Sequence, residues 1–149
     1  MKNHFILIKL PGHSSTGVKL SARLAALKLL ECGYWPIFNR TRNKKVMKAD
    51  DEVAIYLGGA YNQMVIATAK IGSIDQWNRA YAKTYPLAMD GIPEVVLKLS
   101  DINIFKQPVD IIENLDKLSF IPENKKKWGV AFMGGVRRIN DSDFKTMTS

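Results

Sequence analysis

The sequence predicts an α+β domain built round a curved or closed β-sheet. Short aliphatic segments separated by turn residues indicate several strands, and an apolar stripe of helical period follows the first of them. No repeat, low-complexity tract or linker divides the 149 residues, so we expect a single domain over residues 1–149. A strand, a helix and then several strands with short helices among them is the element order of the α+β class.

The N-terminal segment contains the first strand and the first helix. Residues 5–10 are almost wholly aliphatic and predict a strand that is buried on both faces. Residues 18–31 carry leucines at helical spacing and predict an amphipathic helix. Ser15 or Thr16 is the expected N-cap of this helix, and Gly33 supplies a left-handed stop.

Three more strands are expected in the middle of the chain. Residues 51–57 and 63–71 are two of them, and the glycines and asparagine between them suit a hairpin. Residues 75–91 are aromatic and polar without a clear period, so we expect a long functional or covering loop there. A strand at residues 93–105 follows this loop.

The C-terminal third predicts two short helices and one strand. We expect a helix at residues 107–118, because Pro108 occupies a first helical position and the apolar side chains share one face. Residues 131–139 predict a strand that a glycine pair interrupts. A short closing helix is expected at residues 140–147, with Asn140 as its cap.

Composition limits the compartment and the possible partners. The single cysteine cannot form an internal disulfide, which suits a reducing compartment. The sequence contains neither a signal peptide nor an apolar stretch of the roughly 20 residues that cross a bilayer. We therefore expect a cytoplasmic protein that does not bind membranes.

The net charge of +8 is concentrated in two windows, residues 40–48 and 125–138, which hold 10 of the 22 lysines and arginines. Brought together by the fold, they would form a positive surface for phosphates; the alternative is two solvated loops that keep the protein soluble. The candidate phosphate-binding residues are Arg40, Arg42, Lys44, Lys45, Lys125, Lys126, Arg137 and Arg138.

The sequence lacks the common catalytic and cofactor-binding motifs, including the phosphate-binding glycine loops and zinc-protease patterns. His4 is expected at a strand end and His13 in a loop, far from any cysteine. Cys32 is interpreted as a small buried apolar residue. The carboxylates at residues 50–52 are expected in a turn that enters a strand. We therefore predict no catalytic residue, no metal and no cofactor.

Three tryptophans, Trp35, Trp77 and Trp128, lie outside the confidently predicted elements. Two indoles can hold a flat ring between them, as with a flipped or single-stranded base, and each stack contributes roughly 1 to 3 kcal/mol. Methyl groups add apolar contact in such an aromatic cage. Packing in the core is the alternative for each tryptophan, and Trp128 is interpreted as a structural lid.

Two segments resemble the EVE domain family. Residues 115–144 match its C-terminal signature, with LSFI, Asn-Lys-Lys-x-Trp-Gly, Gly-Gly-x-Arg and a closing Asp-Phe. Residues 34–59 are similar to its earlier signature, in which an aromatic segment leads through basic residues to an acidic turn and a Tyr-bearing strand. Together they cover more than a third of the chain. The resemblance implies the PUA-like fold, a small β-barrel with flanking short helices, related to the YTH domains that read N6-methyladenine.

The resemblance also implies a pocket that takes one modified base. Trp35 corresponds to the first cage aromatic, Trp77 to the second cage wall and Asn39 to the polar group that reads the base edge. Arg137 or Arg138 would meet the flanking phosphates. The complete set of predicted pocket residues is Tyr34, Trp35, Asn39, Tyr56 and Trp77.

On this resemblance we expect a non-enzymatic reader that captures a flipped, methylated or otherwise modified base. DNA is favoured over RNA, with the domain as the specificity module of a modification-dependent restriction system that includes a nuclease or GTPase. A modified-RNA binding protein, a nucleotide- or RNA-processing enzyme and a protein interaction module remain the alternatives.

Overall fold

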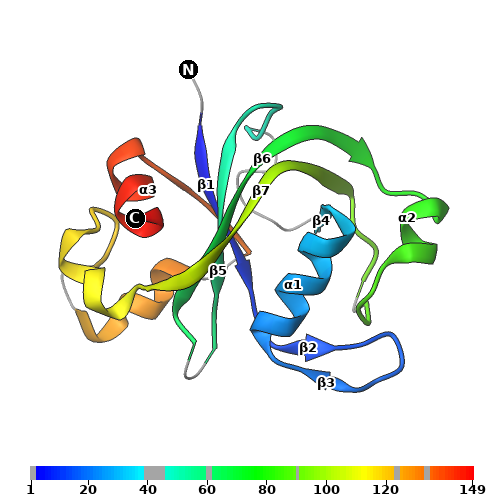
Figure 1. Cartoon of the computed structure of the whole chain (residues 1–149), viewed down its shortest axis with the longest axis horizontal. Coiled ribbons are helices and arrows are strands. Elements are labelled where there is room, and N and C mark those ends of the chain that lie inside the picture. Colours follow the sequence, from blue (N-terminus) through cyan, green and yellow to red (C-terminus); the bar gives the residue numbers. More distant parts are fainter. Residues whose placement is uncertain (1–2, 39–45, 60–61, 90, 123–124, 133–134) are drawn as a thin grey trace.

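The computed structural model describes residues 3–38, 46–59, 62–89, 91–122, 125–132 and 135–149. A six-stranded sheet curls into a half-barrel, and helices flank both of its faces (Figure 1). The strand order is β4-β7-β6-β5-β1-β8, so β4 and β8 form its edges. The fold class is therefore α+β, as the element order of the sequence predicts.

The sheet is mixed, with one parallel pair. β1 runs parallel to β5, whereas the other neighbouring strands pair in the antiparallel direction. A small second sheet pairs β2 with β3 below the first helix. The strands are β1 (His4–Lys9), β2 (Gly12–His13), β3 (Lys19–Leu20), β4 (Tyr34–Ile37), β5 (Glu52–Leu57), β6 (Met64–Gln76), β7 (Val95–Asp110) and β8 (Val136–Ile139).

Within the described residues, three α-helices and two 3₁₀ helices accompany the sheet. α1, with β2, β3 and α2, lies on one side of the sheet, and α3 lies with the 3₁₀ helices on the other (Figure 1). The helices are α1 (Ala22–Cys32), α2 (Arg79–Thr84), η1 (Ile112–Lys117), η2 (Lys125–Phe132) and α3 (Asp141–Thr148).

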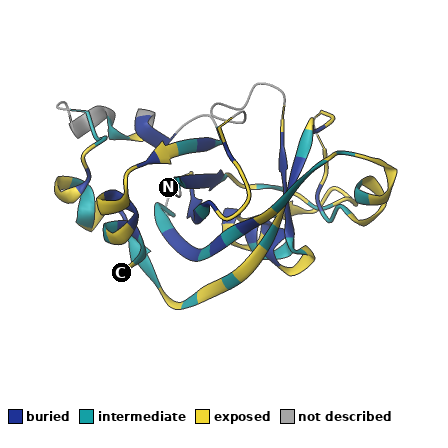
Figure 2. Ribbon diagram, turned by 90° about the horizontal axis from the view of Figure 1, so that it is seen from above, coloured by how far each residue is buried: buried dark blue, intermediate teal, exposed yellow. Residues whose placement is uncertain are grey.

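Two apolar clusters pack on opposite faces of the sheet, because side chains alternate along each strand. In β1, Phe5 and Leu7 pack with α1, whereas Ile6 and Ile8 pack with α3. We call these the α1 core and the α3 core. The buried residues concentrate in the inner strands, whereas the second half of β7 is largely exposed (Figure 2).

The curl of the sheet comes from its two longest strands. β6 has 13 residues and β7 has 16, and their pairing register shifts at three places. Each bulge adds a local bend and increases the twist, so a long hairpin wraps round the core instead of lying flat. At Gly72 an added Cβ would lie 3.3 Å from the carbonyl oxygen of Lys98, so the close approach of these strands favours glycine there.

The first helix is shorter than the sequence predicts. It begins at Ala22, and Ser21 is its N-cap, accepting the backbone N–H of Leu24 at 3.1 Å. The predicted caps Ser15 and Thr16 are wrong, because residues 19 and 20 pair with residues 12 and 13 and cannot join the helix. The predicted stop is confirmed: Gly33 has φ +79° and its N–H donates to Leu29 and Leu30.

Two predicted elements are wrong in type. The loop expected at residues 75–91 contains the end of β6 and α2, which Asn78 caps through its side chain. The helix expected at residues 107–118 is the end of β7 followed by η1, because residues 109 and 110 pair with β6. Pairing along β6 thus overrides the local preference of Pro108 for a helix start.

The closing segment agrees with the sequence prediction. Asn140 caps α3 and accepts the N–H of Asp143 at 2.7 Å. The strand before it is limited to Val136–Ile139, since Ala131 and Phe132 end η2 instead. Trp128 packs against the α3 core, edge-on to Phe132, which fits its interpretation as a lid.

Candidate nucleic-acid interface

A cavity of about 110 Å³ lies at the end of β4, between α1 and the start of β8. We call it the β4 cavity. A single buried water needs roughly 10 to 15 Å³ of such space, so the cavity has room for a group much larger than water. Its walls come from distant parts of the chain: Ile8, Lys9, Leu29, Trp35, Pro36, Ile37, Phe38, Tyr85, Gly135 and Val136.

Trp35 forms the inner wall of this cavity. It lies in β4, paired with Leu97 of β7, and its side chain is only 4% exposed. The sequence placed it outside the strands, and the structure corrects this. Trp35 packs in the α1 core and also lines the cavity, so the core fixes its indole ring in position.

Trp77 does not line the β4 cavity with Trp35. Its ring stacks on Tyr81, with centroids 5.9 Å apart and planes at 23°, and meets Tyr85 edge to face at 5.6 Å. Tyr85, directly after α2, is the aromatic residue of this cluster that reaches the cavity. Tyr85 thus lines the cavity in the place predicted for Trp77, and Trp77 contacts the Tyr85 ring without lining the cavity.

Tyr85 was missed because its position depends on α2, which the sequence did not predict. The helix ends at Thr84, and the backbone turns to φ −63° and ψ 121° at Tyr85. The isolated bridge between Ser14 and Leu87 and the N–H of Ala88 donating to His13 join this segment to β2. The one local signal in the sequence is that Tyr85 directly precedes Pro86, because the residue before a proline disfavours the helical conformation and helices commonly end there.

The carboxylate of Asp75 holds Tyr81, which belongs to the aromatic cluster of Trp77, Tyr81 and Tyr85. The hydroxyl of Tyr81 donates to Oδ2 of Asp75 at 2.6 Å, and Nζ of Lys98 lies 3.5 Å from the same oxygen. The hydrogen bond from Tyr81, and then the charge of Lys98, lower the pKa of Asp75, against an opposing effect of desolvation. The same hydrogen bond raises the pKa of Tyr81.

Tyr34 has a supporting position and does not line the β4 cavity. Its hydroxyl lies 2.9 Å from that of Thr84 and 3.3 Å from the carbonyl oxygen of Tyr81, and its ring meets the Tyr81 ring edge-on. Burial is the main cause that raises the pKa of Tyr34. Tyr34 thus fastens α2 to β4.

Tyr56 lies on the opposite face of the sheet from Trp35. Its side chain is 2% exposed, belongs to the α3 core and stacks on Phe132, with ring centroids 4.3 Å apart. Burial raises the pKa of its hydroxyl strongly. The structure therefore does not bring Tyr56 to the cavity, because alternation along β5 turns it to the α3 side.

Two predicted arginines can be placed, and they lie on different faces of β8. Arg137 turns toward the α3 core: its guanidinium lies 4.7 Å from the Phe120 ring centroid, and Nη1 donates to the carbonyl oxygen of Ala131 at 3.4 Å. Arg138 is exposed on the same face of β8 as Val136, which lines the β4 cavity. Arg138 is the more exposed of the two and the better candidate for a phosphate contact, but its guanidinium donates to Asn3, at the other end of β1 from the cavity.

The remaining predicted residues cannot be placed. Asn39, Arg40, Arg42, Lys44 and Lys45 lie outside the described residues, directly after Phe38 of the cavity wall. The backbones of Lys125 and Lys126 belong to η2, but their side chains are not described.

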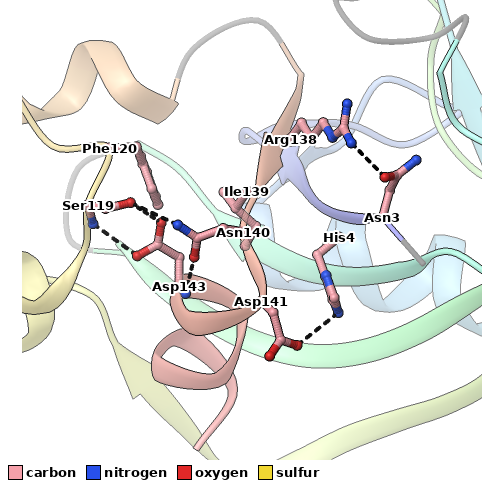
Figure 3. A pocket seen from close by; sticks show the side chains of 9 residues that line it. All are labelled: Asn3, His4, Ser119, Phe120, Arg138, Ile139, Asn140, Asp141 and Asp143. Carbon is pink, nitrogen blue, oxygen red and sulfur yellow. Dashed lines mark hydrogen bonds and ion pairs between the residues drawn. The ribbon is translucent and has the colours of Figure 1, made fainter. Parts of the chain in front are cut away.

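A second, larger cavity of about 570 Å³ lies beside the start of α3 (Figure 3). Its polar groups bind one another: Arg138 donates to Oδ1 of Asn3 at 2.7 Å, and Nε2 of His4 lies 3.5 Å from Oδ1 of Asp141. Asp143, 2% exposed, accepts the N–H of Ser119 at 2.9 Å and its hydroxyl at 2.5 Å. These bonds join α3 to β1, β8 and the segment after η1.

The carboxylates at residues 50–52 have structural partners. Asp51 is fully buried and accepts the N–H groups of Asn3 at 3.0 Å and Lys48 at 2.9 Å. Oε1 of Glu52 lies 3.4 Å from Nε2 of His4. The interpretation of this segment as a turn that enters a strand is confirmed, since β5 begins at Glu52.

Cys32 is exposed, so the prediction of a buried cysteine is wrong. Desolvation and then the neighbouring charge of Glu31 raise the pKa of its thiol, which opposes reactivity. Among the described residues, no group of three or more His, Cys, Asp and Glu side chains could hold a metal ion. Within the described ranges, none of the helices is both long and apolar enough to cross a membrane.

No family model matches the sequence, and no curated protein matches it either. Solved structures do match over nearly the whole chain. The human THYN1 protein, in complex with DNA that contains 5-methylcytosine, has a TM-score of 0.57 at 14% identity, covering 97% of this chain and 94% of that one. The N-terminal domain of McrB from Staphylothermus marinus also has a TM-score of 0.57, at 9% identity, covering 97% and 92%.

These likenesses concern the fold. Together with the curled six-stranded sheet and its short flanking helices, they confirm the predicted fold class, an α+β domain with a PUA-like curled sheet.

Proposed function

We propose that this domain binds nucleic acid and reads one modified base in the β4 cavity, without catalysing a reaction. The observation that carries the proposal is the cavity itself, which Trp35 and Tyr85 both line. The fold is shared with a protein whose structure contains 5-methylcytosine DNA. Extruding a base costs a few kcal/mol, and stacking on aromatic walls offsets this cost.

Both aromatic walls are held before any ligand arrives. Trp35 is fixed by the α1 core, and Tyr85 is supported by Trp77, which in turn stacks on the Tyr81 ring. A wall that is already ordered loses little side-chain entropy when a base enters. Such a cavity can also discriminate a methyl group, because fixed walls cannot move to accommodate different shapes.

The surrounding charge supports a polyanionic ligand. The chain carries a net charge of +8, and Lys9 lines the cavity. Arg138 is three residues after Gly135 of the cavity wall, or about 10 Å along a strand. A phosphate contact by Arg138 requires its guanidinium to leave Asn3, to which it donates at 2.7 Å, and would add affinity without sequence information.

We favour DNA over RNA, because the THYN1 protein, which shares this fold, was solved in complex with 5-methylcytosine DNA. We further propose that the domain is the specificity module of a modification-dependent restriction system, acting with a nuclease or GTPase. The likeness to the McrB N-terminal domain is in keeping with this role.

A binding panel tests the proposal. The panel consists of oligonucleotides that differ at one position, which carries cytosine, 5-methylcytosine, 5-hydroxymethylcytosine, adenine or N6-methyladenine, in DNA and RNA, each as single strand and duplex. We expect one modified base to bind at least about fourfold more tightly than its unmodified parent, because the cavity buries one additional methyl group, which contributes about 0.8 kcal/mol. Equal affinity for all members would contradict base reading.

Two variants test whether the β4 cavity is the source of the preference for the modified base. Tyr85→Ala removes one wall and should abolish the preference for the modified base. Trp128→Ala is the matched control, since Trp128 is a partly buried aromatic residue on the α3 side of the sheet. It should keep the preference, even where it lowers the melting temperature. Loss of preference in both variants would point to unfolding rather than to the cavity.

A further inference from the structure

The helix α2 lies at one end of the molecule, after the end of the long strand β6 (Figure 1). None of its six residues is buried (Figure 2). The residue that directly follows the helix, Tyr85, lines the β4 cavity. α2 is therefore an exposed element that ends at the wall of the cavity.

The side chains of this segment divide between two faces. Trp77, Tyr81 and Tyr85 follow one another at intervals of four residues and contact one another as the aromatic cluster. Arg79 and Lys83 are also four residues apart and are both exposed. They are offset from Tyr81 by two residues, which is about 200° round a helix. The two cations therefore form a row on the face of α2 that is turned away from Tyr81.

Arg79 and Lys83 do not stabilise the fold through ion pairs, since neither has one with any residue that the structure describes. The sequence from residue 76 to residue 89 contains no acidic side chain that could pair with them. Arg79 is also the first residue of α2, where the positive end of the helix dipole disfavours a cation. Its position costs helix stability, which indicates a role outside the fold.

A phosphate backbone fits this row of cations. Exposed cations beside aromatic side chains are the arrangement by which proteins follow the backbone of a nucleic acid. Lys83 is two residues before Tyr85, and Arg79 lies about 9 Å from Tyr85 along the helix axis, at 1.5 Å per residue. A strand whose base enters the β4 cavity would thus pass its neighbouring phosphates within reach of two long cationic side chains.

We propose that Arg79 and Lys83 bind consecutive phosphates of the strand that carries the captured base, within about two nucleotides of that base. α2 then has two functions, since its aromatic face contacts the ring of Tyr85 and its cationic face binds the backbone. The phosphate contacts add affinity for any sequence, whereas the cavity selects the base. This inference rests on the proposed function, which places the captured base beside Tyr85.

Salt titrations of DNA binding test the contacts. The α2 variant carries Arg79→Gln and Lys83→Gln, and the matched control carries Lys106→Gln and Lys117→Gln. The control removes the same charge from two exposed lysines on the η1 and α3 side of the sheet. We expect the α2 variant to bind modified and unmodified duplexes more weakly and to reduce the slope of log K against log salt by about 2, one for each phosphate contact.

The two variants should differ in no other property. The control should keep the slope of the wild type, and both variants should keep the wild-type ratio of affinities for the modified and the unmodified base. Arg79→Gln alone should melt at or above the wild-type temperature, because it removes a cation from the start of a helix. A weaker affinity of the α2 variant then reflects lost contacts with DNA rather than unfolding.

Neutral methylphosphonates locate the contacts along the DNA. One phosphate at a time is replaced near the modified base, first in the modified strand and then in the complementary strand. The wild type should lose about fivefold in affinity at each of two adjacent phosphates of the modified strand, the effect of one lost charge contact. The α2 variant should lose nothing further at these two phosphates, because the cations that bind them are already absent.

Three results would overturn the proposal. An α2 variant with the slope of the control would show that α2 does not contact the backbone. Equal methylphosphonate losses in the wild type and the α2 variant would assign those phosphates to other residues, and losses confined to the complementary strand would place the contacts on the wrong strand. Failure of base reading is a separate result: if no modified base is preferred, the proposed function fails and this inference fails with it, even where the slope shows that α2 contacts unmodified DNA.

Discussion

The indole of Trp77 meets the ring of Tyr85 edge to face, with centroids 5.6 Å apart and planes at 85°. Tyr85, the residue directly after α2, lines the β4 cavity together with Trp35. Edge-to-face pairs contribute roughly 0.5 to 1.5 kcal/mol beyond area burial, which is enough to hold one ring against another. Under the proposed function, Trp77 would therefore act on a bound base through Tyr85.

This relationship predicts different effects of two substitutions. Tyr85→Ala should remove the preference for a modified base, whereas Trp77→Ala should reduce the preference only partly, since it loosens the wall without removing it. Trp77→Phe keeps an aromatic edge and should restore most of the preference. Equilibrium binding of the modified and unmodified oligonucleotides measures all three variants. A larger loss from Trp77→Ala than from Tyr85→Ala would make Trp77 the wall.

Substitutions of the two neighbouring arginines of β8 should have different effects, one on DNA affinity and the other on the stability of the fold. Arg138→Gln should weaken binding to modified and unmodified DNA alike and reduce the slope of log K against log salt by about 1, the effect of one lost phosphate contact. Arg137→Gln should leave that slope unchanged and lower the unfolding free energy by about 1 to 2 kcal/mol, because it loses the Phe120 ring and the Ala131 carbonyl. Salt titrations of DNA binding measure the slope, and urea denaturation measures the unfolding free energy. A changed slope in Arg137→Gln with a loss of stability in Arg138→Gln would mean that Arg137 contacts the phosphate and Arg138 stabilises the fold.

The buried carboxylate of Asp143 should dominate the stability of the C-terminal segment. Asp143→Ala leaves the N–H of Ser119 without its acceptor, so we expect the unfolding free energy to fall by about 2 to 4 kcal/mol. Asp141→Ala is the matched control in the same turn: its side chain is 62% exposed, and loss of its contacts with His4 and Lys145 should cost less than about 1 kcal/mol. Urea denaturation measures the loss of unfolding free energy in both variants, and unchanged m-values show that the unfolding transition itself is the same. Similar losses of unfolding free energy in the two variants would mean that burial of the Asp143 carboxylate does not increase its contribution to stability.

The pair of Tyr81 and Asp75 predicts a pH effect. The folded-state pKa of Asp75 lies below its unfolded value, mainly because the Tyr81 hydroxyl donates to it. The carboxylate therefore adds stability above the unfolded pKa, and this contribution is lost as the pH falls through the folded pKa. Tyr81→Phe should raise the pKa of Asp75 toward its ordinary value, and Lys98→Gln should raise it less. An NMR titration of the side-chain carboxyl carbon measures both, and an unchanged pKa in Tyr81→Phe would contradict the assignment.

Most of the fold could be predicted from local sequence signals. The first strand, the stop of α1 at Gly33 and the cap of α3 at Asn140 depend on residues that are neighbours in the chain. The errors fall where long-range pairing competes with local preference. Pro108 marks a helix start by its own chemistry, but the strand continues because residues 109 and 110 bind β6.

The candidate site was predicted less completely than the fold. Trp35 was identified from its chemistry and lines the cavity. Tyr56 was wrongly expected beside it, because its side of the sheet depends on the register of β5 between β1 and β6. Tyr85 could not be identified, since its position requires α2, and nothing in the sequence tells which aromatic residue of the segment will reach Trp35.

The sequence by itself determined the domain class, the excess of positive charge and the aromatic residues available for stacking, because these follow from composition and from contacts between neighbours in the chain. Only the tertiary structure decided which aromatic residue lines the β4 cavity with Trp35 and which arginine shares its side of the sheet. The β4 cavity joins residues from 8 to 136, and their meeting depends on strand alternation, on the bulges between β6 and β7 and on the anchoring of α2. These are long-range packing interactions that no local pattern contains.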